Sequence, residues 1–162
     1  MRKDLEWEYA DSEVSVAKIK EFGLQLGFQL PQDYIDCVKV NGGASVLPEE
    51  FRVGNEERCF GSLFSFDEES CEYIVKKYET YKPFLPQKLF PIANDPAGNL
   101  ICLDYKNTER PVVIFWEHEN AWEKEMLILE EGLSEEQAEE RARENVFYVA
   151  ESFTAFLDKL HD

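Results

Sequence analysis

Oxygen-bearing side chains near position 100 could bind a hard cation such as calcium, which prefers oxygen ligands. The candidates are Asp95, Asn99 and Asp104, but their spacing lacks the regular ligand positions of an EF-hand loop. Asp-Pro-x-Gly-Asn is also a common turn sequence, because Pro96 suits the second position of a type I turn and Gly98 readily adopts a positive φ. We therefore predict a hairpin turn here and no metal site.

A histidine between two glutamates, Glu117-His118-Glu119, is the place where a general acid–base catalyst could form. Successive residues of a strand point to opposite faces, however, so these three side chains would not converge on one substrate. The other histidine, His161, lies beside the C-terminus, and no Ser-His-Asp or Cys-His pairing is evident. We predict an exposed strand end here, and no enzymatic activity.

The cysteines point to a reducing compartment rather than to zinc. They stand at positions 37, 59, 71 and 102 without a C-x-x-C spacing, and the chain has two histidines to add to them. We interpret them as free thiols and expect no cofactor. The charged N-terminus does not have the form of a signal peptide, and no stretch approaches the roughly 20 apolar residues that span a bilayer. The sequence therefore predicts a cytoplasmic protein.

Helices are predicted at the start of the chain. Ser15 or Ser12 can cap a first helix that runs to about Leu26, with apolar residues along one face. Pro31 suits the first turn of a second helix over residues 31–40, because the N–H that proline lacks has no partner in a first turn.

Further helices are predicted in the middle and at the end. After short strands within residues 44–66, a third helix is expected over 67–81 with Asp67 as its N-cap. Within residues 146–160, apolar side chains recur at helical spacing, and Ser152 can cap this last helix.

A mainly antiparallel sheet is predicted between these helices. The apolar runs 89–93 and 100–103 flank the turn described above and form a hairpin. The continuous apolar run 111–116 is typical of a central strand covered on both faces. The sequence therefore predicts one α+β domain over residues 1–162, with helices packed on the sheet from the N-terminus, the middle and the C-terminus of the chain.

Acidic residues outnumber basic ones two to one: 34 Asp and Glu against 17 Lys and Arg give a formal net charge of −17. Such a surface repels nucleic acid and anionic membranes, whose phosphates bind Lys and Arg, and it attracts cations or basic proteins. The charge is uneven, because residues 117–144 hold eleven glutamates against three basic residues, a net of −8. Ser134 and Gln137 form a capping-box sequence within this segment. The segment is either a solvated excursion between the last strand and the last helix or a docking surface for a basic partner.

Several motifs follow one another in a fixed order along the chain. They are Leu30-Pro31-x-Asp33-Tyr34, Asn41-Gly42-Gly43, Leu89-Phe90-Pro91-Ile92-Ala93-x-Asp95-x-x-Gly98-Asn99-x-Ile101-Cys102-x-Asp104, Val112 to His118, and Val149-Ala150-x-Ser152-Phe153-x-x-Phe156-Leu157. Together their order and spacing resemble those of the SUKH superfamily, which contains bacterial immunity proteins of the Smi/Knr type and fungal cell-wall regulators. The resemblance runs over about residues 16–160, except for a Glu-rich excursion over about 119–145 that matches none of these motifs.

The resemblance implies an α+β fold, no enzymatic activity and a protein partner. Many bacterial members bind and neutralise the toxin domain encoded by a neighbouring gene, often a nuclease. An acidic surface could cover the basic cleft of such a nuclease. The residues expected to bind it are glutamates of the acidic segment: Glu117, Glu119, Glu130, Glu131, Glu135, Glu136, Glu139 and Glu140. The alternatives are a regulatory adaptor of the same fold and a small metal-dependent hydrolase.

Overall fold

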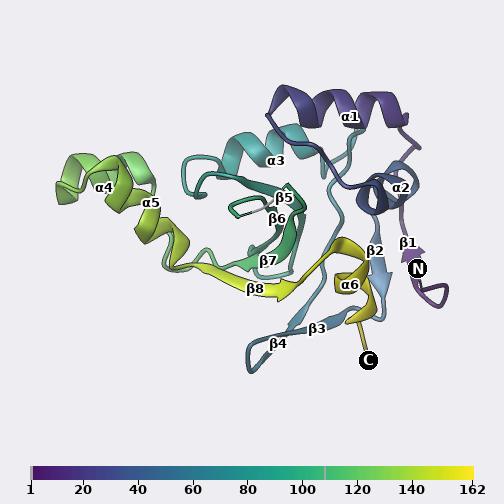
Figure 1. Cartoon of the computed structure of the whole chain (residues 1–162). Coiled ribbons are helices and arrows are strands. Elements are labelled where there is room, and N and C mark those ends of the chain that lie inside the picture. The colour runs from purple at the N-terminus through teal and green to yellow at the C-terminus, as the bar shows by residue number, and fades with distance from the viewer. Residues whose placement is uncertain (1, 108) are drawn as a thin grey trace.

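A four-stranded antiparallel sheet in the order β5-β6-β7-β8 lies at the centre of the computed structural model, which describes residues 2–107 and 109–162 (Figure 1). Two further antiparallel pairs, β1 with β2 and β3 with β4, complete the strands of the described residues. The strands are β1 Glu6–Glu8, β2 Ser45–Leu47, β3 Glu50–Val53, β4 Glu56–Cys59, β5 Leu89–Asn94, β6 Leu100–Asp104, β7 Val112–Trp116 and β8 Val146–Ala150. The helices are α1 Val16–Gln25, α2 Gln32–Asn41, α3 Ile74–Tyr81, α4 Lys124–Glu131, α5 Glu135–Arg143 and α6 Phe153–Asp158.

The two inner strands of the sheet form the centre of the core. Every residue of β6 is buried, and β7 is buried from Val113 to Trp116. In Figure 1, α1 and α3 lie above the sheet. Helices α2 and α6 contact each other and lie at the right of the sheet. This arrangement confirms the α+β fold, the hairpin of β5 with β6 and the central position of the third apolar run.

Aromatic side chains join the helices to the sheet. The ring of Tyr34 in α2 meets Phe153 of α6 edge-on at 5.5 Å and approaches Phe90 of β5 at 6.4 Å. Phe51 of β3 lies 5.2 Å from Phe156 of α6. Edge-to-face contacts of this kind stabilise the fold in addition to the stabilisation from burying apolar area. The aromatic residues named here therefore belong to the core.

The predicted caps of the first and last helices are confirmed. The Ser15 hydroxyl accepts the N–H of Lys18, and the Ser152 hydroxyl accepts that of Ala155. Pro31 lies one position earlier than predicted: it is the N-cap of α2, with an extended ψ of 147°, and not a member of the first turn.

The third helix is shorter than predicted. It begins at Ile74, and Asp67 instead accepts the N–H of Glu69 within a preceding turn. The reason is tertiary: the backbone of Ser65 bonds to Glu72 and Ile74, which holds the intervening residues in a loop. Side-chain caps and turns compete for the same local hydrogen bonds, so the sequence pattern alone does not separate them.

The last strand of the sheet was missed by the sequence analysis. Residues 146–150 form β8, which pairs with β7 through Trp116 opposite Val146 and Phe115 opposite Phe147. The Glu-rich segment therefore connects two neighbouring strands, and does not link the last strand to the last helix as predicted. It also contains α4, a helix that the sequence analysis did not predict.

Candidate functional site

The turn that could have bound calcium is closed by its own side chains. Oδ1 of Asp95 accepts the backbone N–H groups of Ala97 at 3.0 Å and Asn99 at 2.8 Å, and Oδ2 accepts the Asn99 side-chain amide at 3.0 Å. Gly98 takes a φ of 89°, so the predicted turn chemistry is confirmed. Asp104, the third candidate ligand, is bound to Arg143. Among the residues that the structure describes, no group of three or more His, Cys, Asp or Glu is arranged to hold a metal ion.

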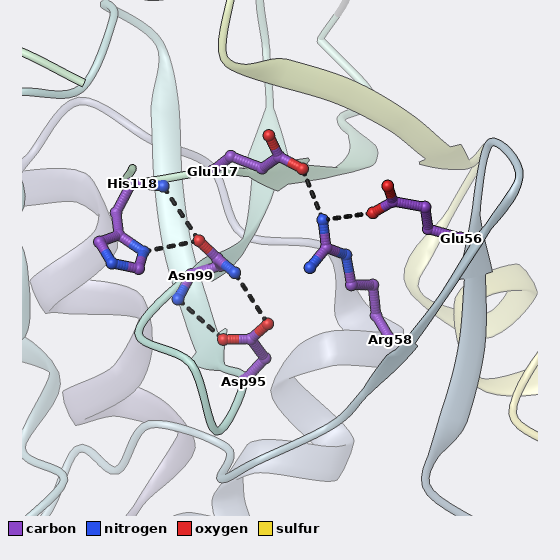
Figure 2. Close-up of polar contacts among 6 residues, drawn as sticks. All are labelled: Glu56, Arg58, Asp95, Asn99, Glu117 and His118. Carbon is purple, nitrogen blue, oxygen red and sulfur yellow. Dashed lines mark hydrogen bonds and ion pairs between the residues drawn. The ribbon is translucent and has the colours of Figure 1, made fainter. Parts of the chain in front are cut away.

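His118 continues this chain of hydrogen bonds (Figure 2). Its backbone N–H and its Nδ1 both lie against Oδ1 of Asn99, at 3.0 and 2.7 Å. The Asn99 amide donates to Asp95, which orients its oxygen toward His118, so the imidazole donates from Nδ1. The ring is exposed, and it serves as an outer support of the hairpin turn.

Glu117 points away from its histidine neighbour. Its carboxylate accepts a hydrogen bond of 2.6 Å from the guanidinium of Arg58 in β4 (Figure 2). The same guanidinium lies 2.8 Å from the carboxylate of Glu56, which is also in β4. The Arg58 guanidinium stands over the ring of Phe115, 4.9 Å from its centroid. Glu117 and His118 thus diverge as alternating strand residues do, and their geometry does not make an acid–base pair.

The described cysteines are free, and two of them are buried. Burial raises the pKa of the Cys37 thiol to about 12, and it also raises the pKa of Cys102. Because the thiolate is the reactive form, these two thiols are core side chains without nucleophilic character.

An open groove of about 1130 Å³ runs between the α1–α2 connection and the start of α6. Asp33, one of its lining carboxylates, accepts hydrogen bonds from the backbone and the hydroxyl of Thr154. His118 and the predicted partner-binding glutamates do not line this groove.

The Glu-rich segment folds into two helices, α4 and α5, which we call the acidic arm (residues 124–143). The arm projects from one end of the sheet, at the left of Figure 1. Its buried apolar residues are Leu127 of α4 and the small Ala138 and Ala142 of α5. The predicted capping box is present: Gln137 N–H donates to the Ser134 hydroxyl, and Ser134 N–H donates to the Gln137 side chain.

Hydrogen bonds fix the base of the arm to the sheet. Arg143 forms a two-pronged ion pair with Asp104, at 2.7 and 3.2 Å, and also donates to the Gln87 carbonyl at 2.8 Å. The Glu139 carboxylate accepts the Gln87 N–H at 3.0 Å and the Lys124 ammonium at 2.6 Å. Paired, partly buried groups of this kind hold one geometry. The arm therefore presents a pre-positioned surface.

The predicted partner-binding glutamates divide into two groups. Glu117 and Glu139 are half-buried and bound to Arg58 and Lys124, respectively. The others are exposed and form no ion pair with a basic residue of the described chain. They are Glu119, Glu130, Glu131, Glu135, Glu136 and Glu140. Four of the eight, Glu130, Glu131, Glu135 and Glu136, lie around the tip of the arm, where α4 turns into α5.

Three exposed apolar side chains in the same region were not predicted from the sequence. Trp122, Met126 and Leu129 are 63%, 37% and 72% exposed. Their spacing of four and three residues is the helical signal that could have revealed α4. The sequence interpretation that the Phe and Trp side chains form the core, because their positions follow strand and helix periods, is wrong for Trp122.

No helix among the described residues is long and apolar enough to cross a membrane.

Comparison with known proteins places the chain in a family. It is 26% identical over 121 residues to YokK, an uncharacterized protein derived from the SPbeta prophage of Bacillus subtilis strain 168. The match covers 63% of this chain and 61% of that relative. The SMI1/KNR4 family (SUKH-1), which is generally non-catalytic, matches residues 13–159, a range that includes the whole sheet and the acidic arm. The chain therefore belongs to the SMI1/KNR4 family, as the sequence motifs predicted.

Proposed function

We propose that this protein is a non-enzymatic immunity protein of the cytosol that binds and neutralises a cognate toxin domain through its acidic arm. The proposal is supported by the exposure of the predicted glutamates and by the fixed position of the arm. Six of the predicted glutamates are exposed and form no ion pair within the described residues, and most of them lie on an arm that is hydrogen-bonded in place. Family membership supports a protein partner of this kind.

A nuclease toxin fits the charge of the arm. An enzyme that cleaves nucleic acid needs a basic cleft for phosphates, and that cleft is complementary to a surface of exposed carboxylates. Opposite charges of this kind raise association rates by roughly 10- to 1,000-fold at low salt. Fast capture benefits an inhibitor that is made alongside a lethal enzyme.

Pre-positioning favours binding by the arm. Ordering a flexible segment at the moment of association costs free energy. The contacts of Arg143 with Asp104 and of Glu139 with Gln87 hold the arm before any partner arrives.

Co-expression with the toxin domain encoded beside its gene tests the proposal. We expect the wild-type chain to restore growth and to bind the purified, catalytically inactive toxin domain in a one-to-one complex. Persistent toxicity while the protein is abundant and folded would contradict the immunity function. A regulatory adaptor of the same fold, the alternative, would bind a partner without protecting the cell.

A further inference from the structure

Exposed apolar side chains concentrate at the start of the arm and immediately before it. Nine large hydrophobic residues are exposed in the described chain, and three of these lie within eight residues, at Trp122, Met126 and Leu129. Met126 and Leu129 are three positions apart on α4, so they share one helix face. Trp122 precedes the first turn of that helix.

This face is not needed to pack the arm. Helices α4 and α5 contact each other, and Leu127 is the buried apolar residue of α4. Its direction on the helix differs from that of Met126 and Leu129. Large exposed apolar side chains that do not pack against their own chain are typical of interaction sites. Trp and Met are also enriched where protein interfaces are most deeply buried.

Carboxylates border the apolar row on both sides. With 3.6 residues per turn, Glu125 falls on one flank of the line from Met126 to Leu129, and Glu130 falls on the other. Both glutamates are exposed and form no ion pair among the described residues. The face is therefore an apolar strip within a negatively charged surround.

The negative charge around the apolar strip indicates which kind of surface binds it. A second copy would bring the same carboxylates together, and like charges across an interface oppose association. A membrane-binding helix carries Lys and Arg on its polar face, because lipid headgroups are anionic. The complementary occupant is a protein surface with an apolar pocket rimmed by Lys and Arg.

We propose that Trp122, Met126 and Leu129 form the apolar anchor of the arm, which inserts into such a pocket on a basic protein partner. The proposal rests on the immunity function and extends it by giving the glutamates and the anchor separate roles in binding. The glutamates accelerate association, while the anchor slows dissociation, because buried aromatic and aliphatic contacts surrounded by a polar rim determine how long a complex lasts.

The dissociation rate from the catalytically inactive toxin domain tests the anchor. We expect Trp122→Ala and Leu129→Ala each to raise it by roughly 10- to 100-fold, the range of interface hot spots. The association rate and its salt dependence should stay within about threefold of the wild type. Leu24→Ala and Tyr148→Ala are matched controls, because they remove similarly exposed side chains outside the arm, at 66% and 61%. Thermal melting confirms that each variant is folded.

The outcomes distinguish a failure of the anchor from a failure of the immunity function. If the toxin is bound and neutralised but both arm variants dissociate at the wild-type rate, the anchor is wrong and immunity stands. If the toxin is not bound at all, both proposals fail together. Sedimentation of the free protein supplies a third outcome: a wild-type dimer that Leu129→Ala converts to a monomer would assign this face to a second copy and overturn the anchor.

Discussion

The inner strands of the sheet and the acidic arm use their side chains in opposite ways. In β6 and β7 nearly every residue is buried, and the polar side chains of Asp95, Asn99 and Asp104 are hydrogen-bonded or ion-paired within the chain. In the arm, a few residues maintain the fold, and most of the others face solvent without a partner.

This difference separates stability from recognition. Substitutions in a packed core change stability because volume and contacts are lost, whereas exposed positions change it little. A scaffold of this kind tolerates variation in the arm while it keeps the sheet intact. The arm is therefore the region in which we expect partner choice to be encoded.

The largest expected effect is a loss of stability, and it is tested by truncating one large side chain in the sheet and one in the arm. Phe115→Ala removes a fully buried ring that meets Phe51 at 6.1 Å, and we expect a loss of about 3–5 kcal/mol in the free energy of unfolding. Leu129→Ala in the arm should change it by less than about 0.5 kcal/mol. Urea unfolding followed by circular dichroism measures both, and equal losses would break the comparison.

A smaller effect is expected at the junction of the two regions. Arg143→Met leaves the Asp104 carboxylate without its ion pair; the two side chains are 17% and 11% exposed. Partial burial reduces the cost below that of a fully buried pair, to about 1–3 kcal/mol. Arg141→Met is the control, because its contact with Glu144 is long, at 3.7 Å, and exposed, so its loss should be barely measurable. An Arg143 variant as stable as the control would show that the arm is not fixed at this point.

The smallest effect distinguishes two helix caps of the same chemistry. Ser134→Ala removes one half of the capping box of α5, and Ser152→Ala removes the cap of α6. Each should cost about 1 kcal/mol. Amide hydrogen exchange should locate the first loss in the arm alone, whereas the second should accelerate exchange throughout the sheet because α6 packs in the core. Faster exchange in β6 of the Ser134 variant would contradict the separation of the arm from the sheet.

Local features of the fold were predictable from the sequence. The Asp95–Asn99 turn, the caps at Ser15 and Ser152 and the strand 112–116 depend on neighbouring residues, whose types specify them directly. The short strand β8 depends on pairing with β7, and the start of α3 depends on the backbone of Ser65. Such distant partners leave no periodic signal in a single sequence.

The candidate site was predictable in composition and not in detail. The count of glutamates identified a segment whose carboxylates are mostly exposed, but it treated Glu117 and Glu139 like their exposed neighbours. Only the folded chain brings Arg58 and Lys124 to these two carboxylates. The strand and helix periods assigned Trp122 to the core, but it lies just before the first turn of α4 and is exposed.

The association rate with the toxin domain, measured against salt concentration, tests the central claim most directly. The arm-reversal variant carries Glu→Lys at positions 130, 131, 135 and 136, and the control-reversal variant carries the same change at the exposed glutamates 13, 21, 69 and 79. Both change the net charge equally. We predict that arm reversal lowers the low-salt association rate by roughly tenfold or more and flattens its salt dependence, whereas control reversal has a much smaller effect. Equal effects of the two variants would contradict the claim that the arm is the docking surface.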